Sequence, residues 1–123
     1  MKHRDCLIID DEQRFANMLA KRLSLRGCEC EVSYKGLDAL NLIARKRFAL
    51  VLLDLHLPDI YGVEVLARIK EISPKTPVVI ITGHGSEEDR EICIQQGAHA
   101  FMNKPVGIED LIGIWTQVRE MSA

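Results

Sequence analysis

Carboxylate, hydroxyl and ammonium side chains follow four apolar runs of this sequence: Asp10, Asp11, Asp54, Thr82 and Lys104. Three carboxylates in one pocket would repel one another, and a hard divalent cation such as Mg²⁺ would relieve the repulsion. A bound metal would also keep Asp54 ionised and able to attack a phosphorus centre. Thr82 offers a hydroxyl donor, and Lys104 a positive charge, to phosphoryl oxygens. The set predicts phosphoryl transfer, which depends on positioning and charge neutralisation.

Five strands that alternate with five helices must position these side chains. Such alternation predicts right-handed crossovers and a parallel sheet with helices on both faces. Ligands bind these sheets at the carboxyl ends of the strands, where the strand order reverses. In a sheet of order 2-1-3-4-5, the three carboxylates would converge in one crevice, with Thr82 and Lys104 beside them. The predicted strands are Cys6–Asp10, Cys28–Ser33, Ala49–Asp54, Val78–Thr82 and Ala98–Asn103, and the predicted helices are Glu12–Arg26, Leu37–Lys46, Val63–Ile72, Glu87–Gln96 and Ile108–Glu120.

The length and the net charge of the chain limit the classes of protein to which it can belong. A chain of 123 residues can bury enough surface for one core, so we predict a single domain over residues 1–123. A formal charge of −2 gives no broad basic surface for direct nucleic acid contact. The longest uninterrupted apolar run, Phe48–Leu53, is too short for a membrane span. Two aspartates interrupt the apolar stretch near the N-terminus, so it is no secretory signal, and the expected location is the cytoplasm.

The four cysteines show no metal-binding spacing. None of them forms C-x-x-C, and the four histidines make no zinc-type spacing with them. Cys28 and Cys30 lie two residues apart in a strand-like run, so they share one face. We interpret the cysteines as buried thiols that pack like small apolar side chains in a reducing compartment, in preference to a redox pair. They are Cys6, Cys28, Cys30 and Cys93.

Four short motifs carry a resemblance to a known family. They are Asp10-Asp11, Asp54-Leu55-His56-Leu57-Pro58, Thr82-Gly83 and Lys104-Pro105. Together they resemble the receiver domain of bacterial two-component response regulators, over essentially the whole chain. The resemblance implies a flavodoxin-like α/β fold, doubly wound, with a five-stranded parallel sheet of order 2-1-3-4-5 and five helices. It also implies a cis peptide bond before Pro105.

The same resemblance implies a role in signal transduction. Asp54 would accept a phosphoryl group from a phosphohistidine on a sensor histidine kinase or phosphotransfer protein. Thr82 and Lys104 would bind the phosphoryl oxygens. Such a domain is not an enzyme, because it catalyses only its own phosphorylation and slow autodephosphorylation.

The resemblance further implies a set of Mg²⁺ ligands. Asp11 would ligate the ion directly, and Asp10 would do so directly or through water. Asp54 and the backbone carbonyl of His56 would complete the protein's share of the ligands.

Phe101, three residues before the lysine, stands where the family has an aromatic switch. After phosphorylation Thr82 would move toward the phosphate, and Phe101 would turn inward into the space released. Many relatives have Tyr here, whose hydroxyl bonds to the loop after the fourth strand, and Phe lacks that hydroxyl. The alternative interpretation is a plain core or edge aromatic.

The family signals through the surface formed by the fourth helix, fifth strand and fifth helix. Ile112 and Ile114 flank the apolar stripe of the last helix and would suit a homodimer or effector contact, although a wide core face explains them equally well. The segment 81–85 is similar to receivers fused to transcriptional output domains. An excised domain and a stand-alone protein both fit the sequence.

Two histidines, His56 and His84, follow Asp54 and Thr82 by two residues each. In receivers these positions flank the path of the water that hydrolyses the acyl phosphate. Imidazole charge changes between about pH 5 and 8. Our hypothesis is that both rings set the lifetime of the phosphoryl group and make it pH-sensitive, and the alternative is that both are solvated and inert.

Three rival functions remain to be compared. An aspartyl phosphatase of the haloacid-dehalogenase type wants a second Asp two residues after the nucleophile, where this chain has His56. A flavin or dinucleotide domain needs a phosphate loop after the first strand, where Asp10-Asp11-Glu12 would repel a phosphate. The third is a pseudo-receiver that cannot be phosphorylated.

Overall fold

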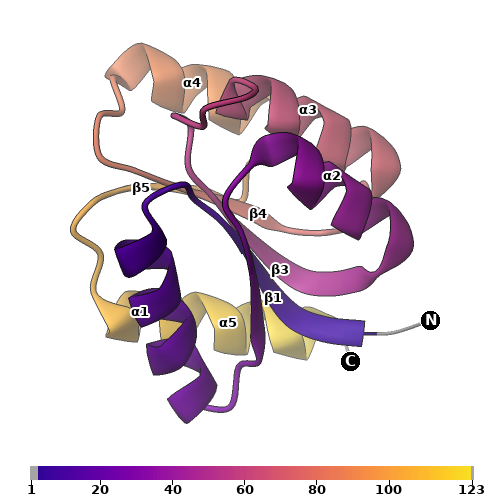
Figure 1. The fold of residues 1–123 in the computed structure, drawn as a ribbon, viewed down its shortest axis with the longest axis vertical. Helices are drawn as coiled ribbons and strands as arrows, with labels where there is room; N and C mark the ends of the chain where they lie inside the picture. Colours follow the sequence, from indigo (N-terminus) through magenta and orange to yellow (C-terminus); the bar gives the residue numbers. More distant parts are fainter. Residues whose placement is uncertain (1–2, 123) are drawn as a thin grey trace.

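The computed structural model describes residues 3–122, in which five strands alternate with five helices (Figure 1). No helix in this range is both long and apolar enough to cross a membrane. The predicted domain also includes Met1, Lys2 and Ala123, which lie outside the described residues. The strands are β1 (His3–Ile9), β2 (Cys30–Ser33), β3 (Arg47–Leu53), β4 (Val78–Thr82) and β5 (Ala100–Asn103), and the helices are α1 (Gln13–Leu25), α2 (Gly36–Arg45), α3 (Gly62–Ile72), α4 (Glu87–Gln95) and α5 (Ile108–Ser122).

The strands form one parallel sheet of order β2-β1-β3-β4-β5. This order confirms the predicted flavodoxin-like fold. Its central strands are covered on both faces, which is why their apolar residues run without interruption. In β1, for example, the residues from Cys6 to Ile9 are at most 1% exposed. The order reverses between β1 and β3, and this point defines the crevice in which a ligand is expected.

The sheet separates two apolar cores (Figure 1). Helices α2, α3 and α4 pack on one face, and helices α1 and α5 pack on the other. Successive side chains of a strand point to opposite faces. Leu7 and Ile9 of β1 therefore join the core beneath α2, α3 and α4, whereas Cys6 and Ile8 join the core beneath α1 and α5.

The starts of β2 and β5 were predicted two residues too early. The cause is the same at both places, because the preceding helix still holds the residue that was assigned to the strand. The N–H of Cys28 donates to the carbonyl of Leu23 at 3.0 Å, and the N–H of Ala98 donates to the carbonyl of Cys93 at 3.0 Å. A glycine with positive φ precedes each of these residues and turns the chain out of the helix.

Two helices begin with carboxylate caps. In α4, Ser86 and Asp89 form a capping box, in which each side chain accepts a hydrogen bond from the other residue's N–H. In α2 the cap comes from a distant loop, since the Asp59 carboxylate accepts from the N–H groups of Gly36 and Leu37, each at 2.9 Å. This second cap ties the start of α2 to the loop between β3 and α3.

The sheet register places the predicted site residues at one edge. The N–H of Asp54 donates to the carbonyl of Ile9 at 2.9 Å, so Asp54 emerges directly beside Asp10. The N–H of Lys104 donates to the carbonyl of Thr82 at 2.9 Å, so these two residues leave β5 and β4 side by side. Backbone pairing alone therefore brings together residues that are far apart in the sequence.

Candidate functional site

The ammonium of Lys104 lies among three carboxylates at the carboxyl edge of the sheet. Its Nζ is 3.0 Å from Asp10 Oδ2 and 3.6 Å from Asp54 Oδ2, and it also donates a hydrogen bond to Glu12 Oε1. Asp10 and Asp54 are only 2% and 5% exposed, so solvent screens these charges little. The structure thus brings Asp10, Asp54 and Lys104 together.

Glu12 is a member of this site that the sequence interpretation missed. Asp10, Glu12 and Asp54 each place a carboxylate oxygen within 4.8 Å of the other two. Glu12 is the N-cap residue of α1, and its N–H donates to Asp10 Oδ1 at 2.9 Å. The available signal was the acidic run Asp10-Asp11-Glu12, but which of its carboxylates turns toward Asp54 depends on the backbone turn into α1.

The charges of the pocket shift the pKa values of Asp10 and Lys104. Burial raises the pKa of Asp10, although the hydrogen bond from the Glu12 N–H and the contact with Lys104 partly oppose this. Burial by itself would lower the pKa of Lys104, but its hydrogen bonds to Glu12 and Asp10 outweigh burial and raise that pKa. Lys104 is therefore charged at neutral pH. Three carboxylates facing one ammonium leave the pocket suited to a further cation.

Phe15 of α1 is a second residue that the sequence interpretation did not assign to the site. The Lys104 Nζ lies 4.4 Å from the centroid of the Phe15 ring. A cation over an aromatic face is attracted by the negative charge of that face. Phe15 therefore helps to hold the Lys104 side chain over the acidic group, as a positioning residue.

Thr82 presents an unpaired hydroxyl next to this group. The residue is fully buried, and its Oγ1 has no hydrogen-bond partner among the described residues. A buried hydroxyl without a partner costs about 1–3 kcal/mol, so an incoming oxygen ligand would be stabilised there. At the adjacent Gly83 a methyl group would meet only the Lys104 side chain, at 3.9 Å, so the approach between Thr82 and Lys104 is open.

Asp11 lies apart from the three clustered carboxylates. Its side chain is exposed and lines a surface pocket together with residues 55–61. His56 belongs to the same pocket, and its backbone N–H donates to Asp54 Oδ1 at 3.3 Å. Metal ligation by Asp11 and by the His56 carbonyl stays a prediction.

The loops that carry His56 and His84 are in contact. Nε2 of His56 lies 3.2 Å from the backbone oxygen of His84, which can only accept, so the ring donates this hydrogen bond. The two ring centroids are 6.4 Å apart. The two imidazoles therefore lie near each other, and their effect on phosphoryl lifetime stays a prediction.

Phe101 is buried in this structure, in the core beneath α4. Gly85 makes room for it, because a methyl group at Gly85 would lie 2.5 Å from Phe101 Cζ and 2.7 Å from Thr82 Cγ2. The ring and the threonine thus both lie against Gly85. An inward turn of Phe101 after phosphorylation stays a prediction.

Comparison with protein families decides what this site belongs to. Residues 6–115 match the response regulator receiver domain. The chain belongs to this family. Receiver domains are signalling domains, which agrees with the prediction that the chain is not an enzyme. The acidic group Asp10, Glu12 and Asp54 is typical of a metal-binding receiver site, and the Lys104–Pro105 peptide bond is cis, as the resemblance implied.

Individual relatives agree with the family assignment. The receiver is 33% identical over 112 residues to YkoG of Bacillus subtilis, an uncharacterised transcriptional regulatory protein, covering 91% of this chain and 49% of the relative. The chain thus spans about half the length of this relative.

Two solved structures are also similar. A Burkholderia pseudomallei response regulator with a phosphorylated aspartic acid, calcium ion and citrate has a TM-score of 0.84 and 26% identity, over 100% of this chain and 74% of that one. The beryllofluoride-activated NtrC4 receiver domain dimer has a TM-score of 0.89 and 31% identity, over 100% of both chains.

Proposed function

We propose that Asp54 is the phosphoacceptor of this receiver domain. The donor is a phosphohistidine on a sensor histidine kinase or a phosphotransfer protein. The observation that carries the proposal is the buried group at the sheet edge, where the Lys104 ammonium lies 3.0 Å from Asp10 and 3.6 Å from Asp54. The phosphorylated aspartic acid of the similar Burkholderia structure supports it.

Asp54 is oriented for this reaction by contacts on both of its oxygens. Oδ1 accepts the His56 N–H at 3.3 Å, and Oδ2 faces the Lys104 ammonium at 3.6 Å. In the transfer, an Asp54 oxygen forms a bond to phosphorus while the bond between phosphorus and the imidazole nitrogen of the donor breaks. Lys104 neutralises the phosphoryl charge, and the Thr82 hydroxyl donates to a phosphoryl oxygen, which gives that buried group a partner.

The acidic group fits Mg²⁺. Its donors are hard carboxylate oxygens, which this ion prefers, and three carboxylates exceed the single charge of Lys104. We assign the ion to Asp10, Asp11, Asp54 and the His56 carbonyl. When bound, Mg²⁺ supplies further charge neutralisation at the phosphoryl oxygens.

In the unphosphorylated domain, Glu12 occupies the place on the Lys104 ammonium that a phosphoryl oxygen would take. Glu12 is exposed, and its carboxylate accepts a hydrogen bond from Lys104. A phosphoryl oxygen is also an anionic acceptor, so it can replace Glu12 in this contact. We therefore expect Lys104 to exchange Glu12 for the phosphoryl group, while Glu12 turns into solvent.

The output of phosphorylation, in this proposal, is the surface of α4, β5 and α5. Thr82 moves toward the phosphoryl group, and Phe101, which like Thr82 lies against Gly85, follows. The dimer of the NtrC4 receiver supports a homodimer of this chain through that surface. The transcriptional regulatory relative supports a role in transcription regulation for the protein as a whole, with no nucleic acid contact from residues 1–123.

We also propose that residues 1–123 form a single domain and that the protein is cytoplasmic. The element order from β1 to α5 supports the first statement. The second rests on the proposed reaction, because its kinase partner and its transcriptional output both operate in the cytoplasm of a bacterial cell.

Intact mass measurement tests the proposal. The chain is incubated with acetyl phosphate, with and without Mg²⁺, as wild type, Asp54→Asn and the control Asp38→Asn, an exposed aspartate of α2. We expect a Mg²⁺-dependent gain of one phosphoryl group in wild type and control and none in Asp54→Asn. Steady consumption of acetyl phosphate without an adduct would identify a phosphatase instead. Neither adduct nor consumption, with phosphohistidine donors as well, would identify a pseudo-receiver.

A further inference from the structure

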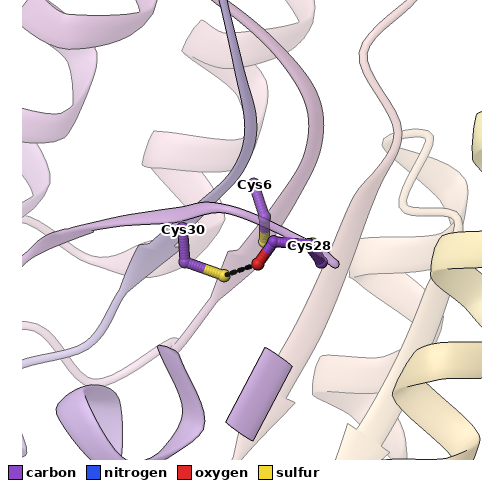
Figure 2. Close-up of side chains that lie close together, drawn as sticks. All are labelled: Cys6, Cys28 and Cys30. Carbon is purple, nitrogen blue, oxygen red and sulfur yellow. Dashed lines mark hydrogen bonds between the residues drawn. The ribbon is translucent and has the colours of Figure 1, made fainter. Parts of the chain in front are cut away.

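Three of the four cysteines meet at one place, far along β1 from the acidic group. The sulfur atoms of Cys6, Cys28 and Cys30 all lie within 4.8 Å of one another (Figure 2). The backbone explains the meeting of two of them, because Cys6 and Cys30 are register partners in the β1–β2 pair. Cys28 lies just before β2, and its side chain is buried in the same core as Cys6. The fourth cysteine, Cys93, lies in the other core.

The surroundings of these thiols are mostly apolar, although the Asp5 carboxylate, which accepts the Glu29 N–H at 2.8 Å, is close enough to act on Cys28 and Cys30. Cys6 and Cys28 are 0% exposed and belong to the core that also contains Leu23 and Leu50. Cys30 is partly exposed on the edge strand, and its thiol donates to the carbonyl of Cys28 at 3.4 Å. Within residues 3–122, no histidine or carboxylate joins the group of three sulfurs.

Three sulfur donors without a fourth ligand favour a soft ion that accepts three-coordination. Zn²⁺ in structural sites takes four ligands, so this group is incomplete for zinc. Burial adds a second constraint, because a net charge in an apolar core is costly. Three thiolates carry three negative charges, and only a trivalent ion cancels them.

We propose that Cys6, Cys28 and Cys30 form a three-coordinate binding site for trivalent arsenic. The reaction balances without any redox step. Arsenous acid, As(OH)₃, reacts with three thiols, so that three As–O bonds break, three As–S bonds form, and the thiol protons leave in three water molecules. The product is neutral, which suits the apolar surroundings.

The position of Cys30 gives the reagent access. It lies on β2, which is an edge strand of the sheet, and it is the one partly exposed member of the three. Arsenous acid is small and uncharged, so it can bond to Cys30 first and then reach the two buried thiols behind it. Cys30 is therefore also the residue that can be changed with least damage to the core.

Native mass spectrometry of the reduced chain with arsenite tests the site. We expect the mass of one arsenic atom to be added and that of three hydrogens to be lost. In Cys30→Ala the dissociation constant should rise at least about tenfold, the effect that even outer-shell changes have on metal sites. Cys93→Ala changes a cysteine of the other core that is as buried as Cys6 and Cys28, and it should bind like wild type.

Three results would overturn the proposal. The first is equal affinity for arsenite in wild type and Cys30→Ala. The second is an adduct that has lost only two hydrogens and kept a hydroxyl on arsenic. The third is a chain that loses two hydrogens without gaining arsenic, which would contain a disulfide. Thermal unfolding followed by circular dichroism checks that Cys30→Ala is folded. Cys6→Ala provides a second variant, and X-ray absorption of the wild-type adduct should count three sulfur neighbours around arsenic.

Discussion

His56 donates a hydrogen bond from Nε2 to the backbone oxygen of His84 at 3.2 Å, and this contact joins the loops that follow β3 and β4. The first of these loops also contacts Asp54, because the His56 N–H donates to Asp54 Oδ1 at 3.3 Å. We expect His84→Ala to change the rate of dephosphorylation and its dependence on pH between about pH 6 and 8, as the hypothesis from the sequence states. Decay of phosphorylated protein, followed by intact mass in wild type, His84→Ala and the control His99→Ala, measures this. Identical rates and pH profiles in all three would show that the rings are inert.

Phe15 should affect the rate of phosphorylation through Lys104. Replacing it by Leu removes the ring that lies 4.4 Å from the ammonium. We expect a loss of about 0.5–1 kcal/mol of interaction energy between the ring and the ammonium. If the transition state loses the same energy, the reaction with acetyl phosphate becomes about two- to fivefold slower. Phe15→Tyr keeps the ring and should react at the wild-type rate. An unchanged rate in Phe15→Leu would mean that the carboxylates alone position Lys104.

Gly85 should control the position of Phe101. In Gly85→Ala the new methyl group would lie 2.5 Å from Phe101 Cζ, so the ring must move or the loop must shift. We expect a stability loss of about 1–3 kcal/mol, typical of overpacking, in urea unfolding. Gly113→Ala is the matched control, because a methyl group there meets nothing within 4 Å in the middle of α5, and it should stabilise by about 1 kcal/mol. A Gly85→Ala variant as stable as wild type would show that this contact is loose.

Asp59 should make the stability of the domain depend on pH. Burial by itself would raise the pKa of Asp59, but the hydrogen bonds from the N–H groups of Leu37 and Gly36 outweigh it and lower that pKa. A carboxyl whose pKa is lowered by folding contributes stability above its unfolded pKa of about 3.9, and the contribution disappears as the pH falls through the folded value.

Urea unfolding of Asp59→Ala and wild type, at pH 7 and below pH 4, tests this cap. We expect Asp59→Ala to be less stable by about 1 kcal/mol at neutral pH, the usual effect of losing a helix cap. The difference should shrink toward zero under acid conditions. Glu71→Ala, at an exposed carboxylate of α3, should show no such dependence. A constant difference at both pH values would mean that the carboxylate charge contributes nothing.

The sequence predicted the part of the site that depends on strand ends. Asp54, Thr82 and Lys104 come together because each follows a buried strand of the same parallel sheet, and apolar runs identify such strands. Glu12 and Phe15 were missed because their contacts with Lys104 depend on how α1 leaves β1 and how its first turn faces the sheet. Hydrophobic pattern does not specify that angle.

The cysteine group was missed for a different reason. Spacing along the chain joins Cys28 to Cys30, but Cys6 joins them only through the register of β1 with β2. Register between parallel strands is a long-range property, because a helix and its two connections separate the strands. The interpretation as buried thiols is confirmed for Cys6, Cys28 and Cys93. It is wrong for Cys30, which lies on the edge strand and is partly exposed.

The separation of the interior into two cores bears on how such a domain diverges among descendants. Phe101 packs in one core and Trp115 in the other, with the sheet between them. Effects of substitutions at distant sites without shared partners add, so a change on one side does not restrict what is tolerated on the other. Successive residues of a single strand such as β1 therefore contribute to different cores. The core on one side of the sheet can change in sequence during evolution while the core on the other side changes independently.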